Sequence, residues 1–97
     1  MDYTYALGDA NKVVARGASS IGNGNINTGW YGTALGGYNV TGYGAIAAGR
    51  YNKAVGEYSV SLGQSTKASG TATYSSGHKT EAIGTYSSAH NWGTKAN

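Results

Sequence analysis

Apolar and polar residues alternate along this chain in short runs, and glycines separate the runs at intervals of seven residues. In the central part these glycines are Gly49, Gly56, Gly63, Gly70, Gly77 and Gly84. The segments between them are of two types, represented by residues 58–62 (YSVSL) and residues 65–69 (STKAS), so the true period is fourteen residues. Self-similarity at a fixed short period predicts a repeat architecture.

Seven such units account for the whole chain, so we expect a single domain over residues 1–97. The units are residues 1–14, 15–28, 29–41, 42–55, 56–69, 70–83 and 84–97. The third unit is one residue short, and the missing residue falls near Val40 and Thr41, just before Gly42. We expect the coil to close more tightly there, with Gly36, Gly37 and Gly42 adopting positive φ angles.

The first half of each unit predicts a strand with two different faces. Its sixth position is always small, whereas the fifth and seventh positions carry larger and often aliphatic side chains. The small residues are Ala6, Ser20, Ala34, Ala47, Ser61, Ser75 and Ala89. Alternation over five residues is typical of a strand. A helix is disfavoured, because each glycine in it would cost about 1 kcal/mol relative to alanine.

The second half of each unit predicts a second, shorter strand. The eleventh position holds Asn11, Asn25, Asn39, Asn52, Thr66, Thr80 and Thr94, and alanine dominates the thirteenth. The intervening position carries Lys12, Lys53, Lys67, Glu81 and Lys95, which must point to water. We therefore predict an all-β fold, a flattened parallel β-solenoid whose coils stack about 4.8 Å apart around a narrow interior.

An inward sixth position leaves an aliphatic column on the outside of one sheet. We interpret this column as a seam with other copies of the chain, since a long exposed apolar patch usually marks an interface. The predicted seam residues are Leu7, Ile21, Leu35, Ile46, Val60 and Leu62. The alternative places leucine and valine inside and the Ala/Ser column outside, but it does not explain why the sixth position stays small.

The third position alternates between tyrosine and small residues: Tyr3, Gly17, Tyr31, Gly44, Tyr58, Ala72 and Tyr86. A tyrosine ring is wider than one strand spacing, so we expect it to lie over the space that glycine leaves in the adjacent coil. This is a packing arrangement and not a ligand cage.

Composition narrows the range of functions. The 97 residues include seventeen glycines and nine tyrosines but no proline and no cysteine, so disulfides and thiolate zinc sites are excluded. The net charge of +3 comes from dispersed residues, and without a basic run we expect no nucleic-acid partner. No apolar stretch approaches the roughly 20 residues that span a bilayer. We interpret the chain as a segment of a longer protein.

The sequence contains no strong catalytic or metal-binding motif. His78 and His90, the two histidines, occupy different positions of the unit, so shared metal ligation is not expected. The four acidic residues form no carboxylate pair. We therefore expect no enzyme activity, no cofactor and no metal site.

The segment Ser59–Gly70 (SVSLGQSTKASG) resembles the head repeat of trimeric autotransporter adhesins, the YadA-like heads, and related segments recur along the whole chain. The resemblance implies a left-handed parallel β-roll of seven coils assembled as a homotrimer. It also implies display on a Gram-negative bacterial surface, with the outer membrane reached only through an anchor domain absent from this segment. Ser76 and His90 stand where leucine or isoleucine is expected, so the seam should weaken at that end.

Two functions are compatible with this architecture. One is an adhesive module that attaches to host matrix proteins, host cell-surface receptors or other cells. The other is a structural spacer in a trimeric surface fibre or a phage tail fibre. Exposed aromatic and basic side chains at the turns favour adhesion. The candidate partner-binding residues are Tyr43, Arg50, Tyr51, His78 and Lys79, with a milder electrostatic contribution from Lys53 and Lys67.

Overall fold

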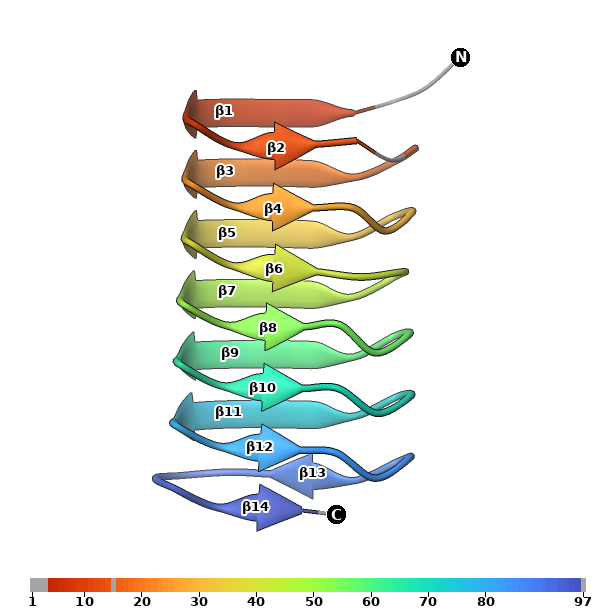
Figure 1. The fold of residues 1–97 in the computed structure, drawn as a ribbon, viewed down its shortest axis with the longest axis vertical. Coiled ribbons are helices and arrows are strands. Elements are labelled where there is room, and N and C mark those ends of the chain that lie inside the picture. Colours follow the sequence, from red (N-terminus) through yellow and green to blue (C-terminus); the bar gives the residue numbers. More distant parts are fainter. Residues whose placement is uncertain (1–3, 15, 97) are drawn as a thin grey trace.

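The protein is an all-β parallel solenoid. The computed structural model describes residues 4–14 and 16–96, and within them every regular element is a strand (Figure 1). The strands are β1 (Tyr5–Asp9), β2 (Lys12–Val13), β3 (Ser19–Asn23), β4 (Ile26–Asn27), β5 (Thr33–Gly37), β6 (Val40–Thr41), β7 (Ile46–Arg50), β8 (Lys53–Ala54), β9 (Val60–Gln64), β10 (Lys67–Ala68), β11 (Tyr74–His78), β12 (Glu81–Ala82), β13 (Ser88–Ala89) and β14 (Lys95–Ala96). The predicted parallel β-solenoid is confirmed, with about six coils of about fourteen residues each where the repeat predicted seven.

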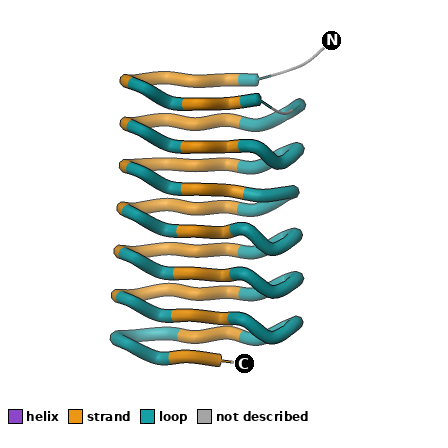
Figure 2. Tube along the Cα trace, in the orientation of Figure 1, coloured by secondary structure: helices purple, strands orange, loops and turns teal. Residues whose placement is uncertain are grey.

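Two parallel sheets of seven strands each form the faces of a slab that measures 37 × 22 × 10 Å. The odd sheet contains β1 to β13 in steps of two, and the even sheet contains β2 to β14 likewise. Strands of the even sheet lie nearer the viewer and point right, while those of the odd sheet lie behind and point left, as the chain descends (Figure 1). Turns join the sheets along both edges (Figure 2).

The interior is narrow and lined by small residues, as predicted. Ala34, Ala47 and Ser61 of the odd sheet are fully buried, and Ala54 and Ala68 of the even sheet face them. The neighbouring Leu35 is 38% exposed, which excludes the alternative arrangement with leucine inside. Ala6 is the exception among the sixth-position residues, because β1 forms the end of the stack and its residues are exposed.

The asparagine column holds successive coils together through fully buried amides. The Oδ1 atom of Asn39 accepts the backbone N–H of Asn52 at 3.0 Å. Its Nδ2 donates to the backbone carbonyl of Leu35 in its own coil at 2.7 Å and to that of Gly49 in the next coil at 3.2 Å. The side chains of this column thus form a ladder along the stack, in which the bonds join side chains mainly to backbone. This arrangement satisfies backbone groups that the turn leaves unpaired.

The short coil is confirmed at the predicted place. Four residues, 42–45, join β6 to β7, whereas five residues, 55–59, join β8 to β9. The conformational prediction is wrong in part: Gly36 has a φ of 113°, but Gly37 and Gly42 do not adopt positive φ. Gly36 has equivalents such as Gly22 and Gly49 in other coils, so its conformation belongs to the repeat and not to the shortening. Gly42 is needed for space, since a β-carbon there would lie 2.8 Å from the Val55 carbonyl oxygen.

Candidate functional site

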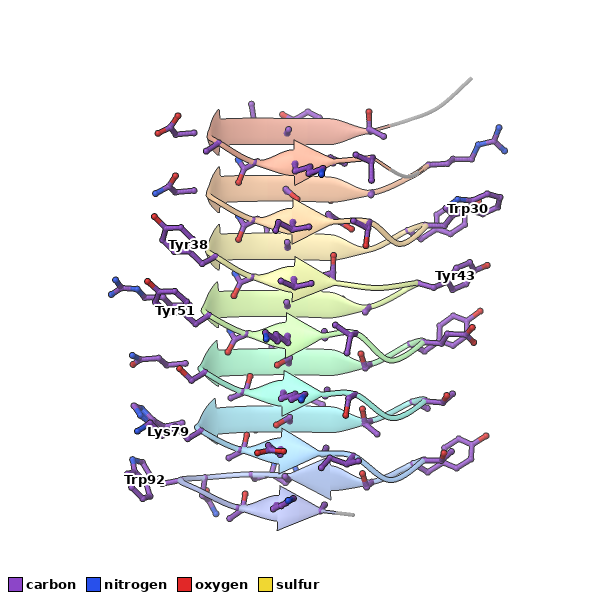
Figure 3. All side chains as sticks on the ribbon, viewed as in Figure 1. Trp30, Tyr38, Tyr43, Tyr51, Lys79 and Trp92 are labelled. Atoms are coloured by element: carbon purple, nitrogen blue, oxygen red, sulfur yellow. The ribbon has the colours of Figure 1, made fainter. Side chains whose placement is uncertain are left out.

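Large aromatic and basic side chains project from two opposite edges of the slab (Figure 3). We call the turns that follow the odd-sheet strands, together with the last residue of each five-residue strand, the Tyr51 edge: residues 9–11, 23–25, 37–39, 50–52, 64–66, 78–80 and 90–94. The turns that follow the even-sheet strands form the Tyr43 edge: residues 16–18, 28–32, 42–45, 55–59, 69–73 and 83–87. Tyr38, Tyr51, Lys79 and Trp92 project from the first edge, and Trp30 and Tyr43 project from the second.

Each turn contains at least one residue in the left-handed backbone conformation, which the sequence pattern did not reveal. On the Tyr51 edge these residues include Tyr38, Tyr51, Ser65 and Lys79, with φ between 56° and 58°. On the Tyr43 edge Tyr31 and Tyr58 have φ angles of 61° and 58°. Such angles are uncommon for bulky residues. The turns keep them because coil-to-coil hydrogen bonds hold the backbone, as between the Ser65 N–H and the Arg50 carbonyl at 2.9 Å.

Glycines on the Tyr43 edge create room for tyrosine rings, as predicted. A β-carbon at Gly17 would lie 2.5 Å from Cδ1 of Tyr31, and one at Gly44 would lie 2.8 Å from Cδ1 of Tyr58. Each ring thus covers the glycine of the preceding coil. Tyr3, the first member of the predicted series, lies outside the described residues. The same device occurs on the other edge, where Tyr38 covers Gly24.

Tyr43 is the centre of an aromatic cluster on its edge. Its ring stacks on Trp30 with centroids 6.4 Å apart, and it meets Tyr31 and Tyr58 edge-on at 6.4 and 5.7 Å. The Arg16 guanidinium lies 6.0 Å from the Trp30 ring. The pKa of Tyr43 is raised above 10.0, first because its phenolate would be repelled by that of Tyr58, and then through desolvation and a hydrogen bond with Tyr58.

The Tyr51 edge combines aromatic with basic groups. Tyr51 stacks on Tyr38 with centroids 5.2 Å apart and an interplanar angle of 9°, and the Arg50 guanidinium lies 5.2 Å from the Tyr51 ring. His78 stacks on Trp92 at 5.9 Å. The sequence reasoning missed Tyr38, although Tyr38 and Tyr51 occupy the same position of successive units.

The structure therefore divides the predicted partner-binding residues between two surfaces. Arg50, Tyr51, His78 and Lys79 share the Tyr51 edge, whereas Tyr43 lies on the opposite edge, across the 22 Å width of the slab. One compact ligand cannot contact both groups on a single copy of the chain. Their role in binding stays a prediction, and the two edges require separate tests.

The predicted seam residues all face outward from the odd sheet. Leu7, Ile21 and Ile46 are 48%, 44% and 41% exposed, and Leu35 is similar. Val60 and Leu62 are half-buried. Toward the C-terminal end the column becomes polar, since Ser76 Oγ and His90 Nδ1 lie 2.9 Å apart. The even sheet is less uniformly charged than the lysine column suggested, because Ile26 in β4 is exposed, as are the aliphatic residues that directly follow its strands: Val14, Val55 and Ile83.

The two histidines lie on different surfaces, with His90 beside Tyr74 on the odd sheet and His78 on the Tyr51 edge. Within residues 4–14 and 16–96, no group of three His, Cys, Asp or Glu side chains could hold a metal ion. The same ranges contain no helix capable of crossing a membrane. Comparison with protein-family models, curated proteins and solved structures gives no match.

Proposed function

We propose that this chain is a head segment of a trimeric bacterial surface adhesin, a rigid rod that presents its turn edges to a partner. The observation that supports this proposal most directly is the outward aliphatic column of the odd sheet. In a single copy of the chain, this column leaves Leu7, Ile21, Leu35 and Ile46 more than a third exposed. Burying such a column against two other copies removes apolar area from water. A trimer would present three copies of each turn edge, which would multiply weak contacts.

The left-handed winding of such heads is supported by Figure 1, where near strands run right and far strands run left while the chain descends. The proposed partner is a host matrix or cell-surface protein or another cell, and the proposed location is the bacterial outer surface. Exposed aromatic and basic groups on both edges favour binding over a spacer role, because such groups dominate recognition surfaces. No catalysis and no cofactor form part of the proposal.

Two measurements test it. Sedimentation of the purified chain at micromolar concentration should give a trimer. The trimer should then bind at least one member of a panel of immobilised matrix proteins and receptor ectodomains, or aggregate cells that display it. A stable monomer would contradict the assembly, whereas a trimer that binds nothing would favour the spacer.

The binding edge can be located with two variants. The first replaces Arg50, Tyr51, His78 and Lys79 with alanine, and the second is Tyr43→Ala on the opposite edge. Both should fold, because Tyr51 and Lys79 have φ angles of 58° and 56°, which alanine adopts natively at Ala10 and Ala72, whereas Tyr43, Arg50 and His78 do not have a positive φ. Loss of binding in only one variant would identify the edge in use.

A further inference from the structure

A hollow of about 380 Å³ lies where the Tyr51 edge meets the outer face of the even sheet. It exists because Ser65 is small: in the coils on either side, the same turn position carries Tyr51 and Lys79. These two long side chains project from one edge in Figure 3. The hollow is therefore a gap of one coil in a row of large side chains, and its size is within the range of small-ligand sites.

The charge around the hollow is unbalanced. Lys53, Lys67, Lys79 and Glu81 all line it, so three ammonium groups face one carboxylate. Lys53 and Lys67 are register partners on β8 and β10, which places two like charges on the same face of adjacent strands. Such neighbours repel each other. Glu81, the register partner of Lys67 on β12, offsets part of this repulsion, and bound anionic groups would relieve the rest.

One wall of the hollow is aromatic. Tyr51 is 47% exposed, and its ring is held in place by stacking on Tyr38 and by the Arg50 guanidinium 5.2 Å from its centroid. An exposed, oriented tyrosine packs well against the C–H face of a sugar ring, because it offers an apolar surface with a polar end. The Ser65 hydroxyl adds a donor and acceptor at the floor.

The hollow is poorly suited to a peptide backbone. The backbone N–H groups of Ser65, Lys67 and Lys79 already donate to carbonyls of neighbouring coils at 2.9 to 3.0 Å. The Thr66 hydroxyl is bonded to Asn52 Oδ1 at 2.7 Å. What remains for a ligand is a set of ammonium groups, one hydroxyl and one aromatic face. These groups complement sulfate or carboxylate substituents on a sugar better than alternating N–H and C=O groups.

We propose that this hollow binds an anionic saccharide, with its acidic groups on Lys53, Lys67 and Lys79 and a sugar ring against Tyr51. The inference deepens the proposed adhesive function, on which it rests, by naming the ligand class. Lysines on successive coils suit a saccharide chain that runs along the rod, because its acidic groups also repeat.

Titration calorimetry of the 97-residue chain tests the site with three probes: a sulfated oligosaccharide, its desulfated uronate-bearing counterpart, and an acidic peptide of equal charge. Ser65→Tyr is the decisive variant. It fills the hollow but keeps every charge, and the fold should accept it because Tyr38 and Tyr51 adopt the same φ at this position. We expect saccharide binding to fall below detection.

Lys67→Gln with Lys79→Gln should weaken saccharide binding about tenfold, since two exposed charge pairs are lost. The matched control is Lys12→Gln with Arg16→Gln, which removes the same charge from residues that do not line the hollow and should leave affinity unchanged. Circular dichroism confirms that each variant is folded. Preference for the sulfated or the uronate probe would identify the acidic group.

Three results would overturn the inference: no saccharide binding by the parent, equal binding by Ser65→Tyr, or binding of the acidic peptide alone. Adhesion to matrix proteins or cells is measured in parallel. Adhesion without saccharide binding would remove only the saccharide inference. Saccharide binding that Ser65→Tyr abolishes, in a chain that does not adhere, would instead contradict the adhesive function.

Discussion

The ring of Tyr58 lies over Gly44, with Cδ1 and Cε1 at 2.8 and 2.9 Å from the point where a β-carbon of residue 44 would stand. Gly44→Ala should therefore displace the ring and also strain a backbone with a φ of 60°. We expect the free energy of unfolding to fall by about 1–3 kcal/mol, measured by urea denaturation. Ala72→Gly is the control, because alanine is native there at a φ of 56°, and this variant should lose little stability. Equal losses would contradict the packing argument.

Gly56→Ala should be more damaging, because its β-carbon would fall on the carbonyl oxygen of Gly70 in the next coil. Backbone cannot move aside as a side chain can, so we expect a loss of about 3 kcal/mol or more. Gly37→Ala provides a matched comparison, since the nearest atom to its β-carbon would be 3.8 Å away. Thermal unfolding should show little change for that variant, and a comparable drop in both would refute the steric explanation.

Asn52→Ala should remove about 2–4 kcal/mol from the free energy of unfolding. The Asn52 side chain is fully buried, accepts the Thr66 N–H at 3.0 Å, and donates to the Gly63 carbonyl at 2.8 Å. Alanine would leave both partners buried and unpaired. Asn52→Thr should cost less, because threonine fills the same position natively at Thr66 and Thr80. If hydrogen exchange showed the neighbouring amides equally protected in the parent and in Asn52→Ala, the ladder would not hold the coils together.

Leu62→Asp should abolish trimer formation, since the proposed seam would bury an uncompensated charge. Val55→Asp introduces the same charge directly after β8 of the even sheet, where Val55 is 45% exposed, and should leave the assembly intact. Sedimentation of both variants distinguishes the faces. If the Val55→Asp variant dissociated into monomers and Leu62→Asp stayed trimeric, the interface would lie on the side of the even sheet.

The raised pKa of Tyr43 predicts a stability loss in alkaline solution. A group whose pKa is higher in the folded state keeps its proton longer there, so its contribution is complete below the unfolded value of 10.0 and is lost as the pH rises through the folded-state value. Tyr43→Phe cannot ionise. Its midpoint of thermal unfolding should therefore fall less than that of the parent between about pH 9 and about pH 11. If the unfolding midpoints of the parent and of Tyr43→Phe fell by the same amount over this pH range, the raised pKa of Tyr43 would be contradicted.

Sequence periodicity predicted the solenoid, the inward Ala/Ser column and the position of the short coil because each depends on side-chain size at a fixed spacing. Handedness could not be predicted in this way, since either sense of winding gives the same column pattern. The φ angles of Gly37 and Gly42 were mispredicted because glycine serves two purposes: positive φ at Gly36, and close backbone approach at Gly42.

The candidate surfaces were predictable only as a list of residues. Nothing in the pattern shows that Tyr51 would hold a left-handed backbone conformation, because that angle arises from hydrogen bonds between coils. The hollow beside Ser65 likewise depends on the neighbouring coils, because this small residue leaves a space only between the larger side chains of Tyr51 and Lys79. When the turn positions are aligned as columns across the coils, Tyr38 stands out as an equivalent of Tyr51, and Ser65 as the small residue between Tyr51 and Lys79.

The thirteen-residue coil shows how a chain of this kind can change over generations. The register passes through the lost residue without a slip, since Thr33 pairs with Ile46 and Val40 with Lys53, so every later side chain keeps its face. A deletion inside a strand would instead have exchanged inside and outside from that point onward. The turns on the Tyr43 edge are therefore positions where evolution, or an engineer grafting a foreign peptide, can alter the length of the chain without changing the strand register of the rest of the rod.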